Sequence, residues 1–251
     1  MPRHALHSFP AIAAVLSFPS ANVQEDSPMG WHIRLSSGGG VHAVYSQQAD
    51  NSCGIACIIM INFKLKKWQL GMAAAASVAL GAWSNPIMDK VMHSAVKSEQ
   101  EVYAAYAKLT GKAYDGSQYT DMGVLVDVLN ELGIGRWSLE HVTNARLASR
   151  LMLGTRGPSA APLMVHVKWR DNGGGHFVVC DEVDFEGTSL VADFCDPFDA
   201  TVKTLAVSPG AGVTYDTKTG PDPFSFVAPH YDYSAGKTGD LTGWVAYRTK
   251  A

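Results

Sequence analysis

The chain has 251 residues and a formal net charge of −3, with 47% apolar and 17% charged residues. That length and apolar content suit a globular protein with a sizeable core, and they exclude an intrinsically disordered chain. The lack of a basic excess argues against a nucleic-acid-binding protein, and no apolar run reaches the roughly 18 to 20 residues that span a bilayer.

Residues 1–28 form the first segment, which we interpret as a flexible tail. An apolar stretch at residues 11–18 follows two basic residues and precedes Pro19, which resembles a weak signal peptide. The four cysteines are too few for a disulfide scaffold and fit either a reducing compartment or a single bridge. The sequence therefore leaves both a cytoplasmic and a secreted, effector-like location open.

Residues 29–251 read as one domain that begins with an irregular segment and one short strand at residues 41–45. Residues 53–63 are almost continuously apolar, as in a helix that is buried on all sides. Asn51 and Ser52 are candidate N-caps of this helix. Three lysines (Lys64, Lys66, Lys67) are expected near its C-terminal end, where the helix dipole favours cations.

The helical half of the domain covers about residues 50–135, and the sheet half about residues 160–251. Further helices are predicted at residues 73–80, 86–96, 100–109 and 121–132. Strands are predicted at residues 163–169, 176–183, 189–194 and 244–247, with a turn at 184–187 and a long loop region at 208–240. Helices that precede antiparallel strands indicate an α+β fold.

A candidate nucleophile, Cys53, stands at the start of the predicted buried helix. The positive end of a helix favours a thiolate, and Gly54 would leave room for a substrate backbone beside the sulfur. Gln47 lies six residues earlier, where its amide could donate a hydrogen bond to a developing oxyanion. The neighbouring Gln48 is the alternative donor.

A thiol nucleophile also needs a base and a group that orients the base. His176 is the strongest candidate because it follows three glycines and opens a predicted strand. A hairpin closed at residues 184–187 would place His176 opposite Cys195 or Asp196, whereas Asp193 would lie roughly 7 to 10 Å away along the strand. We therefore predict Asp196 as the orienting carboxylate. His166 is the reserve base, and the other histidines are expected on the surface or in the core.

Gln47 with residues 53–57, the Gly-His-Phe-Val-Val segment at 175–179, and the Asp-Pro pair at 196–197 together resemble the papain-like cysteine peptidases. Within that group the resemblance is strongest to the bacteriocin-processing peptidases that remove double-glycine leaders, and it covers roughly residues 45–205. It implies a papain-like fold in which the nucleophile helix packs on the antiparallel sheet. It also implies hydrolysis of an amide bond through a thioester, without cofactor or metal.

The same resemblance implies a role for each candidate residue. Cys53 would be the nucleophile, His176 the general base, Asp196 its orienting partner and Gln47 the oxyanion donor. The chain departs from this branch because it has no membrane helices and no ATPase, and because residues after 204 have no assignable counterpart. The peptide or protein substrate and the oligomeric state are therefore left open.

Several alternative readings stand beside the peptidase. The same catalytic residues fit an acyl- or peptidyl-transferase of the phytochelatin-synthase or transglutaminase kind, a bacterial effector or toxin, or an inactive binding module. A zinc site built from Cys53, Cys57, His176 and Cys180 is disfavoured, because the last two would lie about 13 Å apart along one strand. Core packing is the expected role of Cys57 and of the tryptophans Trp137, Trp169 and Trp244.

Overall fold

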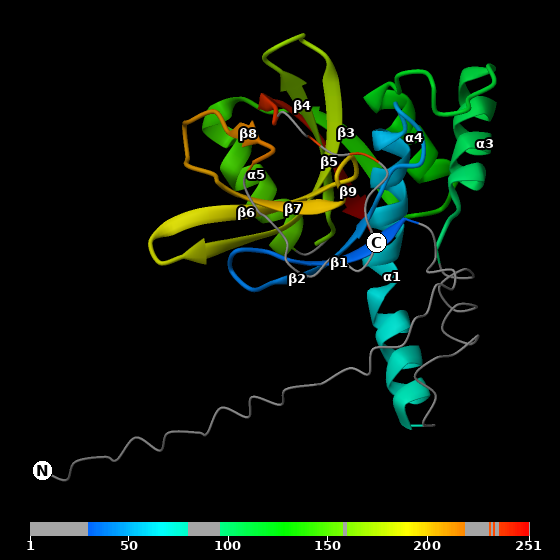
Figure 1. Cartoon of the computed structure of the whole chain (residues 1–251), viewed down its shortest axis with the longest axis horizontal. Helices are drawn as coiled ribbons and strands as arrows, with labels where there is room; N and C mark the ends of the chain where they lie inside the picture. Colours follow the sequence, from blue (N-terminus) through cyan, green and yellow to red (C-terminus); the bar gives the residue numbers. More distant parts are fainter. Residues whose placement is uncertain are drawn as a thin grey trace, which may run out of the picture.

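The computed structural model of the chain describes residues 30–79, 96–157, 160–218, 231, 233 and 236–250 (Figure 1). The predicted tail at 1–28 and most of the predicted helix at 86–96 lie outside these residues. The helices are α1 (Cys53–Ala79), α3 (Glu99–Thr110), α4 (Met122–Glu131) and α5 (Asn144–Arg156). The strands are β1 (Trp31–Leu35), β2 (Val41–Tyr45), β3 (Arg136–His141), β4 (Leu163–Trp169), β5 (Gly175–Glu186), β6 (Ser189–Asp196), β7 (Thr201–Ala206), β8 (Thr214–Asp216) and β9 (Thr238–Lys250).

The prediction of an α+β fold is confirmed, with a large antiparallel sheet at its centre. The strand order is β3-β9-β4-β5-β6-β7, and β8 also pairs with β9. β1 and β2 form a separate two-stranded antiparallel sheet. The final strand β9 thus lies inside the sheet rather than at its edge, so the C-terminal residues are part of the main framework.

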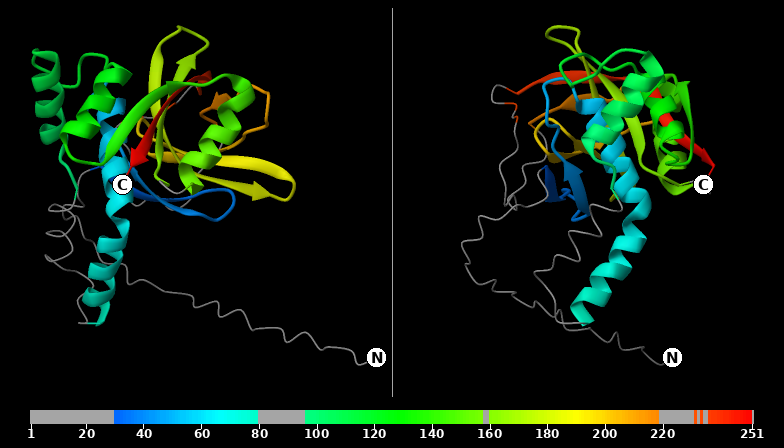
Figure 2. Two further views of the ribbon diagram at one scale, coloured as in Figure 1. Left: turned by 180° about the vertical axis from the view of Figure 1, so that it is seen from behind. Right: turned by 90° about the vertical axis from the view of Figure 1, so that its right-hand side faces the viewer.

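Helices cover both faces of the large sheet. Alternate residues of β4 belong to two different core clusters, Met164 to one and Val165 to the other, as the period of a strand requires. The first cluster joins the sheet to α1, α3 and α4, and the second joins it to α5. Figures 1 and 2 show the corresponding arrangement, with α3 and α4 beside α1 and α5 across the sheet from them.

The helix predicted from Cys53 forms and is buried as expected. Its residues from Ile55 to Ile61 are at most 1% exposed and pack in the first cluster. We expected the helix to end near Lys64, Lys66 and Lys67, but it continues to Ala79 and extends beyond the sheet (Figure 1). Lys64 therefore lies in mid-helix, where its ammonium group meets the partly buried carboxylate of Asp181 rather than the negative end of the helix.

Ser52 occupies the N-cap position of α1, since its carbonyl accepts a hydrogen bond from the Ala56 N–H. Its hydroxyl points backward and exchanges hydrogen bonds with the backbone of Ala49, so it does not cap the first turn. The hydroxyl instead closes the loop that leads into the helix.

Among the described helices, none has the length and apolarity needed to cross a membrane.

The helices predicted at residues 100–109 and 121–132 are confirmed as α3 and α4. Ser98 and Glu101 form a reciprocal capping box at the start of α3, and Asp121 caps α4 through the Val124 N–H. The strands predicted at 41–45 and 163–169 coincide with β2 and β4, and those at 176–183, 189–194 and 244–247 are longer than predicted. Sequence patterns missed five elements, namely β1, β3, β7, β8 and α5.

Candidate active site

Cys53 is the first residue of α1 and is partly exposed, in contrast to the buried residues that follow it. The loop before it is held by the connection between α3 and α4. The Asn51 N–H donates to the Gly116 carbonyl at 3.0 Å, and the Tyr114 hydroxyl donates to the Asn51 carbonyl at 3.1 Å. The position of the thiol is therefore set by a segment more than sixty residues downstream as well as by its own helix.

The structure gives Gly54 a different role from the one predicted. A Cβ atom at this buried position would lie 2.5 Å from Leu125 Cδ1 and 2.6 Å from Thr120 Oγ1. The space beside the glycine is thus occupied by α4 and the residue before its cap. Gly54 permits close packing of α1 on α4, and it does not open a path for substrate.

His176 and Asp196 form a buried pair, with His176 Nε2 2.8 Å from Asp196 Oδ1. The predicted register was wrong, although the predicted partner is the one that His176 meets. The hairpin closes at Gly187, where Glu186 pairs with Ser189, and a β-bulge follows Cys180. Because Cys195 consequently pairs with Val179, Asp196 is a diagonal neighbour of His176 on the same face.

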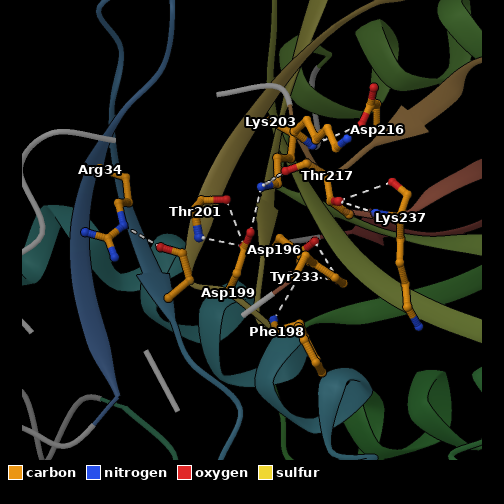
Figure 3. A network of polar contacts seen from close by, with 12 residues as sticks. Arg34, Asp196, Phe198, Asp199, Thr201, Lys203, Asp216, Thr217, Tyr233 and Lys237 are labelled. Carbon is orange, nitrogen blue, oxygen red and sulfur yellow. Dashed lines mark hydrogen bonds and ion pairs between the residues drawn. The ribbon is translucent and has the colours of Figure 1, made fainter. Parts of the chain in front are cut away.

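Asp196 is completely buried and accepts hydrogen bonds from four groups. Besides the His176 ring, they are the Phe198 N–H at 2.9 Å, the Tyr215 hydroxyl at 2.7 Å and the Tyr233 hydroxyl at 3.1 Å. Figure 3 shows Tyr233 and Phe198 grouped around this carboxylate. Burial opposes its charge, but the His176 ring, the charge of Lys203 and the hydrogen bond from Tyr215 together lower the pKa of Asp196 to about 2.

His176 is 4% exposed and interacts with the Cys53 side chain as well as with Asp196. Burial alone would lower the pKa of His176, but the Asp196 carboxylate and the Cys53 sulfur outweigh it and raise the pKa to about 10. Since Nε2 faces Asp196, Nδ1 is the ring nitrogen left for the sulfur. The imidazole therefore connects a carboxylate and a thiol that come from distant parts of the sequence.

Aromatic rings enclose the His176 imidazole. Trp169 stacks on it with a centroid separation of 5.4 Å and an interplanar angle of 20°. The rings of Phe198 and Tyr233 lie nearly perpendicular to the imidazole, each with a centroid separation of 6.4 Å. Trp137, as predicted, packs in the core, whereas Trp244 is 42% exposed and lies against His141.

Gln47 lies beside the active-site strand, since its N–H donates to the Pro197 carbonyl at 2.8 Å. Its side-chain nitrogen donates to the Ala49 and Asp50 carbonyls at 2.9 and 3.0 Å. Both amide hydrogens are thus bound to the loop that precedes Cys53. The alternative donor, Gln48, directs its side-chain nitrogen to the Ser46 carbonyl at 2.7 Å.

A second polar cluster, not predicted from the sequence, lies among β2, α1, β5 and β6. His42 bridges Asp181 and Asp193, at 2.6 and 3.1 Å, and the Lys64 ammonium binds Asp181 and lies 3.6 Å from Cys195 Sγ. Two groups of possible metal ligands among the described residues both include His42. The Lys64 ammonium occupies the first of them, so the cluster is a charge-balanced ion network. Its members lie far apart in sequence and follow no ligand spacing.

The sequence analysis also missed two tyrosines of the site. Tyr215 contacts Asp196, and Tyr233 contacts both Asp196 and His176. Both tyrosines lie in the region interpreted as a long loop, and no spacing connects them to His176. Tyrosines in a glycine- and proline-rich loop were the only available signal. His166, the reserve base, lies on the neighbouring strand β4, where it pairs with Phe177 rather than with His176, and its Nδ1 lies 3.1 Å from Thr242 Oγ1.

Neither a scan against models of known protein families nor a search of curated proteins finds a match to this chain.

Proposed function

We propose that the chain is a papain-like cysteine peptidase that hydrolyses an amide bond in a peptide or protein. The observation that carries this proposal is the arrangement around one imidazole. Asp196 lies 2.8 Å from Nε2 of His176, and Cys53, at the N-terminus of a buried helix, interacts with the same ring. This is the order of orienting group, base and nucleophile that thiol catalysis requires.

In the first half of the proposed reaction, the Cys53 thiolate attacks the scissile carbonyl carbon, and the carbonyl π electrons move onto oxygen. As the oxyanion collapses, the bond from carbon to nitrogen breaks, and the His176 imidazolium gives its proton to the leaving amine. The product is a thioester on Cys53. The raised pKa of His176, about 10, favours the imidazolium that this step needs.

In the second half, His176 takes a proton from water as the water oxygen attacks the thioester. The bond from carbon to sulfur then breaks, which releases the carboxylic acid and restores the thiolate. The backbone N–H of Cys53 is a suitable oxyanion donor because the first N–H groups of a helix have no intrahelical acceptor. Gln47 becomes a second donor if its amide leaves one of its two carbonyl acceptors when substrate binds.

The test is alkylation and turnover of the intact chain. We expect iodoacetamide, followed by peptide mass analysis, to label Cys53 before the three buried cysteines, and Cys53→Ala to abolish cleavage of a peptide library while preserving the circular dichroism spectrum. Asp196→Asn should retain part of the activity, because Asp196 orients the imidazole and does not bond to the substrate. Cleavage by Cys53→Ala would refute the proposal.

The same experiment separates hydrolysis from acyl transfer. Both reactions pass through the thioester on Cys53 and differ only in whether water or an amine attacks it. With an added amine acceptor, a hydrolase releases a free carboxylic acid, whereas a transferase releases an amide whose mass includes the acceptor.

A further inference from the structure

One hydroxyl from the C-terminal part of the chain contacts both His176 and Asp196. We propose that Tyr233 is a positioning residue of the active site, an inference that rests on the proposed function. Its hydroxyl holds the His176 imidazole against Asp196 and so keeps the other ring nitrogen directed at Cys53.

The geometry of Tyr233 carries this inference. Its hydroxyl oxygen lies 3.2 Å from His176 Nε2 and 3.1 Å from Asp196 Oδ2. A hydroxyl can donate one hydrogen bond and accept others. Tyr233 therefore donates to the carboxylate and accepts from the ring N–H, so it shares the proton that Asp196 also binds. Rotation of the imidazole would break two acceptor contacts rather than one.

Tyr215 provides the internal comparison. Its hydroxyl donates to the same carboxylate oxygen, Asp196 Oδ2, at 2.7 Å. Among the described residues, the Tyr215 hydroxyl makes no hydrogen bond to His176. The two tyrosines thus have equivalent roles toward Asp196, and only Tyr233 acts on the imidazole as well.

Tyr233 is held firmly enough for this role. Its ring stacks on Phe198 with a centroid separation of 4.6 Å and an interplanar angle of 30°, and it meets the edge of Trp169 at 5.8 Å. The Lys203 ammonium lies 5.9 Å from the ring centroid. Removal of the hydroxyl alone leaves these ring contacts in place. Tyr233→Phe should therefore fold normally.

Tyr231 supplies a control from the same segment. Its ring also stacks on Phe198, at 5.2 Å, but its hydroxyl interacts with Asp50 and has no described contact with His176 or Asp196. Tyr231→Phe removes the same atom from a neighbouring, similarly stacked ring.

Other titratable or charged groups act on the pair from every packed element, and they stay unchanged in Tyr233→Phe and Tyr231→Phe. They are Cys53 on α1, His166 on β4, Asp199 before β7, Lys203 on β7 and Tyr215 on β8. Differences between the variants therefore report the hydroxyl that was removed.

The experiment measures the alkylation rate of Cys53 by iodoacetate as a function of pH, in the full wild-type chain and in Tyr233→Phe, Tyr231→Phe and Tyr215→Phe. The reagent's carboxylate is attracted by the imidazolium, so the rate falls when His176 loses its proton. We expect the maximal rate of Tyr233→Phe to be about tenfold lower than that of the wild type, because a charge-assisted hydrogen bond is lost. Tyr231→Phe should stay within about twofold of the wild type.

The pH profile distinguishes positioning from packing. Tyr215→Phe and Tyr233→Phe each remove one donor from Asp196, but only Tyr233→Phe also removes an acceptor from the imidazolium. The alkaline fall in rate should therefore occur at lower pH in Tyr233→Phe than in Tyr215→Phe. A profile of Tyr233→Phe that coincides with the wild type or with Tyr215→Phe would overturn the inference.

The two proposals fail in different ways. If the wild-type Cys53 reacts no faster than a free thiol, the proposed function and this inference both fall. If the wild type reacts rapidly and Tyr233→Phe matches it in rate and profile, only the role of Tyr233 is refuted.

Discussion

At the scale of single residues, the chemistry of the site depends on which N–H and O–H groups already donate hydrogen bonds within the protein. Gln47 is 1% exposed, and its side-chain nitrogen donates to two backbone carbonyls. Its Oε1 atom is buried and has no hydrogen-bond partner among the described residues. A buried amide that leaves its acceptor unpaired costs free energy, and the loop before Cys53 gains the two donor contacts in exchange.

Substitution of Gln47 tests its predicted part in the reaction. If the amide reaches the oxyanion in the transition state, Gln47→Ala lowers kcat by about 100-fold with little change in KM, because the contact exists only in that state. Gln48→Ala is the matched control and should stay within about twofold. Steady-state kinetics on a peptide substrate measure both. An unchanged kcat in Gln47→Ala would limit this residue to ordering the loop.

At the scale of elements, the close contact of α1 with α4 depends on one glycine. A methyl group at Gly54 would meet Leu125 Cδ1 at 2.5 Å, so the Leu125 side chain or the helix that carries it must shift to accept it. Gly54→Ala should therefore lower the free energy of unfolding by about 1 to 2 kcal/mol. This is the cost of overpacking after subtraction of the gain from the better helix propensity of alanine. Urea denaturation measures the change.

Gly123 on α4 offers a control for this substitution. A Cβ atom there meets only the side chain of its own helix cap, Asp121, at 3.0 Å. Gly123→Ala should change the free energy of unfolding by less than about 1 kcal/mol. Equal losses in the two variants would argue that the contact between α1 and α4 is not the cause.

The ion network among β2, α1, β5 and β6 joins four elements and predicts a pH dependence of stability. Burial alone would lower the pKa of His42, but hydrogen bonds to Asp181 and Asp193 raise it to about 11. The ordinary histidine value is about 6.5. The stability contributed by His42 is therefore complete below pH of about 6.5 and is lost as the pH rises toward 11.

Replacement of His42 isolates this contribution. The free energy of unfolding of the wild type should fall between pH 7 and 9 by up to about 1.4 kcal/mol per pH unit more than that of His42→Gln. His176, whose pKa is also raised, is present in both proteins and cancels in the comparison. Urea denaturation at several pH values measures the slopes. Parallel slopes would contradict the proposed protonation of His42.

At the scale of the whole molecule, the C-terminal strand closes the sheet. β9 pairs with β3, β4 and β8, so one strand binds three others. Deletion of residues 236–251 should abolish cooperative unfolding, because the backbone groups of β3 and β4 lose their partners. Trp244→Ser keeps the backbone of β9 and should preserve the transition. A truncated chain that still unfolds cooperatively in urea would contradict this account of the sheet.

The predictability of each feature follows from the range of its interactions. The buried helix from Cys53, the strand at residues 163–169 and the amphipathic helix at residues 121–132 depend on local sequence patterns, and they were predicted correctly. The role of Gly54 depends on Leu125, some seventy residues away, and was not. The partner of His176 was identified despite a wrong register, since diagonal neighbours on one strand face also meet.

By itself, the sequence determined an α+β chain with a cysteine at the start of a buried helix, because periodicity and capping are local properties. Only the tertiary structure decided which groups surround His176. The hydroxyls of Tyr215 and Tyr233 reach Asp196 because β8, which carries Tyr215, pairs with β9, and because Tyr233 lies beside His176 and Asp196. Such contacts depend on strand order and register, which are set by packing across the whole core rather than by any local pattern.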